Sequence, residues 1–137
     1  MTSDNLWGDL PEVEDLRTPA SILKEQATRL TEMTAGALRG KTTYLQLAGG
    51  KFNLELRIVA QPLQGYEYTV AKITHPIEQY PLTITADLGG ERVWRASCTD
   101  EAEFVAALRE VLTADKTRAV IASLLAQIKV LGKAASG

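Results

Sequence analysis

Hydrophobic and polar residues alternate along this chain with two different periods, and each period predicts one type of secondary structure. Over residues 19–38 the hydrophobic residues recur every three or four positions, which is the spacing of an amphipathic helix. Thr18 can cap the free amides at its start, and Pro19 suits the first helical position because it has no amide hydrogen. Gly40 follows as a natural stop. We therefore predict a helix over residues 19–38.

The middle of the chain switches to a period of two, which predicts a sheet. Residues 52–58 alternate between hydrophobic and polar side chains, as a strand with one buried face does. Similar runs, separated by short turns rich in glycine and proline, predict five strands over residues 42–48, 52–58, 66–74, 82–86 and 93–98. Because the connections contain no crossover helix, we expect a mainly antiparallel meander.

The orientation of the third predicted strand stays open. If Tyr66, Tyr68 and Val70 face the core, Ile73 falls on the opposite face unless the strand contains a bulge. If the tyrosines face outward instead, they form an aromatic patch of the kind that suits an interface. The pattern favours tyrosines in the core or at the rim of the sheet. The residues expected on the polar open face are Asn53, Glu55, Arg57, Thr83 and Thr85.

Two further helices are predicted after the sheet. Asp100 and Glu103 have the spacing of a capping box, and the hydrophobic stripe that follows predicts a helix over residues 100–112. The polar stretch 113–118 breaks this stripe, and a last helix then continues until Gly132 stops it.

The element order is therefore α-β-β-β-β-β-α-α, which describes an α+β domain. Its five-stranded, mainly antiparallel sheet would carry the N-terminal helix and the two C-terminal helices on one face, because the apolar side of the sheet needs cover. A length of 137 residues fits a single domain. We assign residues 18–132 to this domain, residues 1–17 to an acidic, partly mobile N-terminal arm, and residues 133–137 to a loose C-terminal tail.

The last predicted helix is the clearest sign of a partner. Ten of the thirteen residues in 119–131 are hydrophobic, so this helix has almost no polar face and should be covered on more than one side. Its large side chains fill one arc, which the core explains. The other arc is made mostly of small residues, which let a second helix approach closely: Ala119, Ala122, Ser123, Ala126 and Val130. Either another helix of this chain or a second copy in a homodimer fills that side.

Charge is distributed unevenly, with acidic residues concentrated in the N-terminal arm. Residues 1–17 carry five acidic residues against Arg17 alone, whereas the rest of the chain has twelve acidic and fourteen basic residues. The arm also contains hydrophobic residues, Trp7 among them, so it docks either along its own domain or onto a partner. The sequence has no run or stripe of Lys and Arg, which argues against nucleic acid as a partner.

Cysteine usage and hydropathy point to the cytoplasm. Cys98 is the only cysteine, which excludes an intrachain disulfide and weakly supports a reducing compartment. The first residues lack the basic-then-apolar order of a signal peptide. The apolar run near the C-terminus is shorter than the roughly 20 residues of a membrane span, so we expect no membrane association. The strand pattern also places Cys98 on a buried face, where a thiol is unreactive.

The loop of residues 75–80 offers the best candidate for a small-molecule site, because it collects several polar side chains on a rigid sheet. The candidate ligand-binding residues are His75, Glu78, Gln79 and Tyr80, with Tyr66 and Tyr68 of the third strand. We assign no catalytic residue, since His75 lacks a Ser or Cys nucleophile signature nearby. The sequence also lacks a second histidine, a Cys-x-x-Cys pair or acidic residues at ligand spacing, so we predict no metal and no cofactor.

These observations favour a non-catalytic protein–protein interaction module over an enzyme. We expect a dimer of the regulatory, immunity or accessory type in a bacterial cytoplasm. Its partners would be a second copy of itself, another protein, or both; the small-residue side of helix 119–131 would hold the second copy, and the N-terminal arm with Trp7, or the open face of the sheet, would bind the other protein. The alternative is a small-molecule-binding domain, or a modest enzyme, that uses the 75–80 loop.

Overall fold

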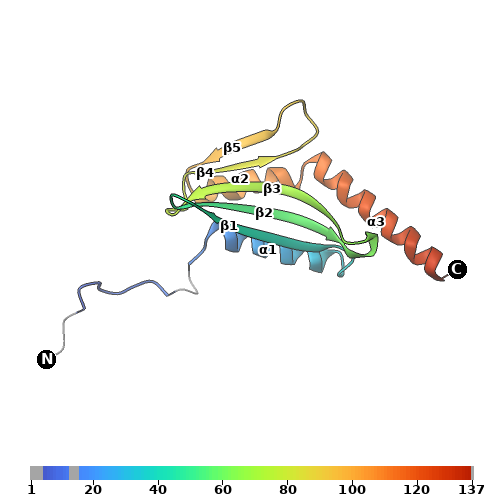
Figure 1. Ribbon diagram of the computed structural model, residues 1–137, viewed down its shortest axis with the longest axis horizontal. Coiled ribbons are helices and arrows are strands. Elements are labelled where there is room, and N and C mark those ends of the chain that lie inside the picture. The colour runs from blue at the N-terminus through green and yellow to red at the C-terminus, as the bar shows by residue number, and fades with distance from the viewer. Residues whose placement is uncertain (1–4, 13–15, 137) are drawn as a thin grey trace.

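The structure, a computed structural model, describes residues 5–12 and 16–136, with side chains as far as Gly132. Within these residues, three α-helices and five strands form a sheet with a helical layer on one side (Figure 1). The elements are α1 (Pro19–Met33), β1 (Arg39–Leu47), β2 (Lys51–Ala60), the short 3-10 helix η2 (Gln61–Leu63), β3 (Tyr66–Pro76), β4 (Leu82–Ala86), β5 (Trp94–Cys98), α2 (Glu101–Leu112) and α3 (Asp115–Ser136). The predicted α+β class is confirmed.

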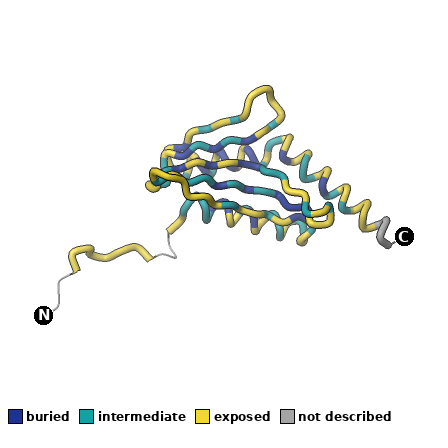
Figure 2. Tube along the Cα trace, in the orientation of Figure 1, coloured by how far each residue is buried: buried dark blue, intermediate teal, exposed yellow. Residues whose placement is uncertain are grey.

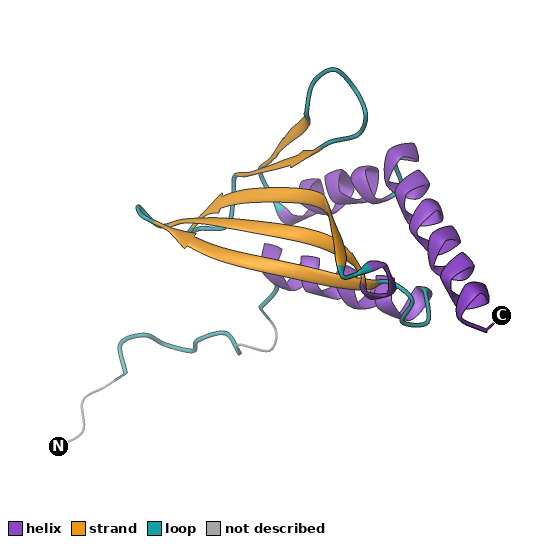
Figure 3. Ribbon diagram, turned by 45° about the vertical axis from the view of Figure 1, so that its right-hand side comes forward, coloured by secondary structure: helices purple, strands orange, loops and turns teal. Residues whose placement is uncertain are grey.

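The sheet is a meander in the order β1-β2-β3-β4-β5, and every neighbouring pair is antiparallel, as predicted. In β2, Leu54, Leu56 and Ile58 are buried, whereas the intervening Asn53 and Glu55 are only partly covered. This alternation divides the sheet into an apolar face and an open face. Helices α1 and α2 cover the apolar face (Figure 3).

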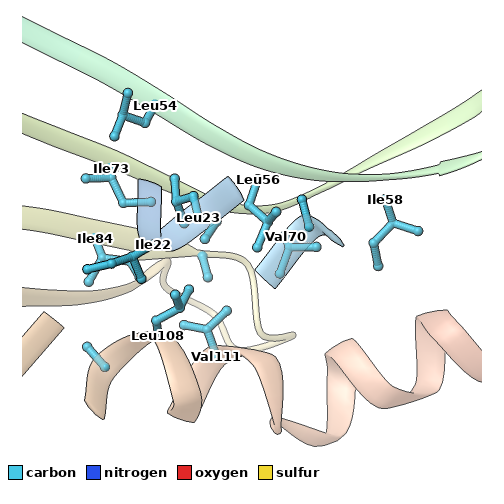
Figure 4. Close-up of a cluster of buried hydrophobic side chains, with 14 of the residues drawn as sticks. Ile22, Leu23, Leu54, Leu56, Ile58, Val70, Ile73, Ile84, Leu108 and Val111 are labelled. Atoms are coloured by element: carbon cyan, nitrogen blue, oxygen red, sulfur yellow. The ribbon is translucent and has the colours of Figure 1, made fainter. Parts of the chain in front are cut away.

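The core lies between that face and the two covering helices (Figure 4). Helix α1 contributes Ile22 and Leu23 to it, and α2 contributes Leu108 and Val111. Phe104 of α2 is the largest of the fully buried side chains. Because burial of one such side chain contributes about 1.5–3 kcal/mol, this cluster is what holds the two helices to the sheet.

A bulge sets the orientation of β3. The register between β2 and β3 shifts at Leu56 and Arg57. As a result, Tyr68 and Ile73 both lie on the helix-covered face, although an odd number of positions separates them. The bulged alternative is therefore confirmed, with Tyr68 half-buried at the core and Tyr66 49% exposed at the rim.

Helix α1 begins at the predicted residue but ends earlier than predicted. The Thr18 side chain accepts a hydrogen bond from the third amide of the helix, as the cap prediction requires. The helix ends at Met33, because the Thr34 hydroxyl accepts a hydrogen bond from the amide of Leu38 at 3.1 Å and the chain turns through Gly36 at φ 83°. Leu38 therefore reaches the core from a turn and not from a helix.

Helix α3 is longer than predicted and projects beyond the sheet (Figures 1 and 3). It packs against α2 and the η2 segment. The predicted stop at Gly132 is wrong, and residues 133–136 continue the helix instead of forming a separate tail. A glycine inside a helix costs only about 1 kcal/mol relative to alanine, so by itself it does not end one.

Candidate interaction surfaces

The outer face of α3 is uncovered. This face, which we define by Ala119, Ala122, Ser123, Ala126 and Val130, consists of exposed residues, and Val130 is 64% exposed. The opposite arc packs partly or fully against the core through Val120, Ile121, Leu124, Leu125 and Ile128. No described helix of this chain lies over the outer face, so the intrachain alternative for covering it is wrong.

A hydrophobic groove lies beside α3. It has a volume of about 480 Å³ and is bounded by α1, α2 and the first turns of α3. Leu56, Ile58 and Val70 of the sheet lie at its base but are at most 4% exposed, so its accessible apolar surface comes from the walls, which include the half-buried Leu30 of α1 and Ile121 of α3. The groove lies where α1, α2 and the start of α3 meet over the sheet.

Arginine side chains surround this groove, and its lining contains no carboxylate. Arg17, at the start of α1, is paired with two glutamates at 3.3 and 3.7 Å. Arg57 is paired with glutamates on the open face of the sheet. By contrast, Arg29 of α1, Arg109 of α2 and Arg118 of α3 form no ion pair with any described residue. The groove therefore combines apolar side chains with three arginines that form no ion pair among the described residues.

The described part of the N-terminal arm carries hydrophobic side chains in solvent. Leu6, Trp7 and Leu10 are 92%, 81% and 68% exposed. In Figures 1 and 2 residues 5–12 lie away from the sheet and the helices. Residues 5–12 therefore do not dock along their own domain in this structure.

The open face of the sheet is polar and cross-linked by ion pairs. Glu67 accepts hydrogen bonds from Lys41 at 3.2 Å and from Arg57 at 3.4 Å. Arg57 also pairs with Glu55, which Lys72 approaches at 3.9 Å. The hydrogen bond from Lys41 is the largest of the effects that hold the pKa of Glu67 below its ordinary value. Most charges on this face are thus satisfied within the face.

The composition predicted for the open face is confirmed. A hollow of about 710 Å³ on this face is lined by Asn53, Glu55, Thr83 and Thr85, and Arg57 adjoins it through Glu55. No described tyrosine lies in that lining. The face therefore offers hydroxyl, amide and charged groups, and it lacks an aromatic patch.

His75 is an interior residue. It is 7% exposed, and its ring stacks on Phe52 with the ring centres 5.1 Å apart. Its Nδ1 lies 2.7 Å from the carbonyl oxygen of Pro76. These contacts explain the histidine as part of the packing at the end of β3, and they leave it little surface for a ligand.

The structure separates the other members of the predicted small-molecule site. Glu78 is exposed, Gln79 and Tyr80 are half-buried, and burial raises the pKa of Tyr80. Tyr66 and Tyr68 lie toward the opposite end of β3, and Tyr66 is nine residues, or about 30 Å, from the histidine. The 75–80 loop and the tyrosines therefore do not form one site.

Neither a reactive thiol nor a metal centre is found among the residues that the structure describes. Cys98 is 1% exposed, and burial, ahead of nearby carboxylates, raises the pKa of its thiol. No group of three or more His, Cys, Asp or Glu side chains in residues 5–12 and 16–132 is arranged to hold a metal ion.

Comparison of the chain with models of protein families, with curated proteins and with solved structures gave no match. Among the described helices, none combines the length and hydrophobicity needed to cross a membrane.

The groove and its arginines are the features that the sequence does not indicate. Arg29, Arg109 and Arg118 lie on three different helices and are up to 89 positions apart in the sequence. From the sequence alone, each is indistinguishable from an ordinary charged surface residue. The nearest signal is Met33, a large hydrophobic residue at the edge of the α1 stripe, which borders the groove and is 83% exposed.

Proposed function

We propose that this chain is a non-catalytic interaction module that forms a homodimer and binds a further protein, with a regulatory, immunity or accessory role in a bacterial cytoplasm. The observation that carries the proposal is the uncovered apolar surface of the helical layer, made by the outer face of α3 and the groove beside it. Contiguous exposed apolar surface on a small domain is typical of an interaction site. The free, buried Cys98 suits a reducing compartment.

A helix-to-helix contact through the outer face of α3 fits a two-fold dimer. Small side chains let two helix axes come close, and in a two-fold dimer the same surface serves both copies. Ala122 and Ala126 lie one helical turn apart at the centre of this face. A charged side chain at either position would be buried without a partner in such an interface, and that is costly.

Sedimentation equilibrium tests the dimer. The unmodified chain should sediment as a dimer at high micromolar concentration, and Ala122→Glu or Ala126→Glu should give a folded monomer. Ala102→Glu makes the same change at an exposed position in the first turn of α2, where the helix dipole tolerates an acid, and should stay dimeric. Circular dichroism establishes that each variant is folded. A monomeric unmodified chain overturns the proposal, and an undiminished dimer in both variants overturns this interface.

The alternative function, a small-molecule site at the 75–80 loop, has less support. Its histidine is packed against Phe52, and its tyrosines lie at the other end of β3. A thermal-shift screen against metabolites, repeated with His75→Ala, tests it. A ligand that stabilises the unmodified chain but not the variant would favour this alternative.

A further inference from the structure

We infer that the arginine-rimmed groove between α1, α2 and α3 binds the acidic N-terminal arm of a second copy of this chain. The inference rests on the proposed homodimer, and it adds a second contact to the one through the outer face of α3. The occupant is the arm segment of residues 5–12, which carries Leu6, Trp7 and Leu10.

The groove and the arm match in hydrophobicity. The groove lining includes Met33, which is 83% exposed, and the half-buried Leu30 and Ile121, and the arm holds three large hydrophobic side chains in water. Burial of apolar surface is favourable at about 25 cal/mol per Å², and an indole side chain is the largest that a chain can bring to a groove. Trp7 is therefore the residue that we expect to anchor the arm.

The groove and the arm also match in charge. Arg29, Arg109 and Arg118 border the groove and have no carboxylate partner among the described residues. Residues 1–16 contain five acidic residues and no Lys or Arg, and Asp9 and Glu12 flank Leu10 closely. Opposite charges placed this way steer the two surfaces together and suppress wrong partners.

The exit of the arm favours the groove of a second copy over its own. Arg17, where the arm joins α1, bonds Glu25 of α1 at 3.3 Å and pairs with Glu101 of α2 at 3.7 Å. These ion pairs hold Arg17, which is itself a lining residue of the groove, between α1 and α2. The described residues 5–12 lie away from the sheet and the helices, as Figure 1 shows, and so outside the groove of their own copy.

Fluorescence of Trp7 reports where the arm lies. The chain has two tryptophans, and Trp94→Phe leaves Trp7 as the only indole. A Trp7 side chain in the groove emits at shorter wavelength than one in water. In the Trp94→Phe chain we expect emission that shifts to shorter wavelength as the concentration rises from low to high micromolar. A shift that is complete at a concentration where the chain sediments as a monomer overturns the inference, because the arm then occupies its own groove.

A mixing experiment separates the two copies. The donor is the Trp94→Phe chain with Arg109→Glu and Arg118→Glu, which weakens its own groove. The acceptor carries Trp7→Ala and Trp94→Phe and keeps its groove intact. Addition of acceptor should shift the donor emission to shorter wavelength, whereas an acceptor that also carries Arg109→Glu and Arg118→Glu should not. Absence of any shift overturns the inference. An acceptor with Arg109→Lys and Arg118→Lys keeps the charge and should still shift the emission.

Sedimentation of the same Trp94→Phe samples distinguishes failure of this inference from failure of the proposed dimer. A dimer in which Trp7 emits as in water overturns the arm contact and leaves the dimer through α3 standing. A monomer with unshifted emission at every concentration overturns both. Circular dichroism of the arginine variants establishes that an absent shift does not come from unfolding.

Discussion

Gly40 of β1 lies directly against the backbone of Ala27 in α1. A Cβ atom built on Gly40 would fall 2.2 Å from the Ala27 carbonyl oxygen, which no side chain can tolerate. The Thr31 hydroxyl supports this approach by accepting a hydrogen bond from the Gly40 amide at 3.0 Å. The glycine that reads in the sequence as a helix stop is therefore the residue that lets α1 pack on the edge of the sheet.

Gly40→Ala should destabilise the fold, since the obstacle is backbone and cannot rotate away. Overpacking of this kind costs about 1–3 kcal/mol or more in free energy of unfolding, measured by urea denaturation. Gly132→Ala is the matched control, because nothing lies within 4 Å of a Cβ at that helical position. The control should be neutral or slightly stabilising, and equal losses in both variants would contradict the close approach.

Thr117 is expected to stabilise the junction between the end of α2 and the start of α3. Its hydroxyl is buried and donates a hydrogen bond to the Val111 carbonyl oxygen at 2.7 Å. Thr117→Val keeps the shape but leaves this acceptor unpaired, at a cost of about 1–2 kcal/mol. Thr113→Val removes a bond of the same length, to the Arg109 carbonyl oxygen, at an exposed position where water replaces it. Urea denaturation should therefore show the larger loss for Thr117→Val, and the reverse order would contradict this role.

The sequence predicts most of the fold because most helices and strands can be recognised from residues that are close together in the chain. Period-two alternation identifies β2, β4 and β5, the glycine and proline turns delimit β1 and β3, and Thr18 and Asp100 mark both helix starts that they cap. The bulge in β3 follows from the same logic, since Tyr68 and Ile73 can share a face only if one residue is inserted. These features depend on residues that are adjacent in the sequence, so the sequence alone is enough to predict them.

The errors arise where tertiary contacts replace local ones. Leu38 continues the helical spacing of α1, yet it is buried by a turn that the Thr34 hydroxyl stabilises. Gly132 resembles a stop but lies within a helix. The groove depends on how far apart α1 and α2 lie on the sheet, and the three arginines that lack an ion pair within the described part of the chain come from three different helices. No local pattern encodes those distances.

Glu103 should make stability depend on pH in the acid range. Its carboxylate accepts hydrogen bonds from the Thr99 hydroxyl and the Thr99 amide, both at 2.6 Å, and these bonds hold its pKa below the ordinary value. Because the folded-state pKa lies below the unfolded value of about 4.3, this contribution is fully present above that pH and is lost as the pH falls through the folded-state pKa.

Glu103→Gln therefore should lower the free energy of unfolding near neutral pH, and the difference from the unmodified chain should shrink as the solution is acidified. Glu110→Gln is the control, since the described residues offer Glu110 no hydrogen bond or ion pair. Urea denaturation of the three chains over the acid range measures both effects. A difference for Glu103→Gln that stays constant with pH would show that the carboxylate charge is not what the Thr99 groups stabilise.

Salt should separate the two contacts proposed for the dimer. Screening shortens the reach of exposed charges from about 10 Å at 0.1 M to about 3 Å at 1 M, which weakens the pairing of arm carboxylates with Arg109 and Arg118. The outer face of α3 is made of small and apolar side chains and does not depend on charge. We therefore expect the dissociation constant of the dimer, measured by sedimentation, to rise with salt in the unmodified chain. In the chain with Asp9→Asn and Glu12→Gln, the dissociation constant should be higher at low salt and should change less as salt is added. If the two chains respond equally, those two carboxylates do not contribute to the contact.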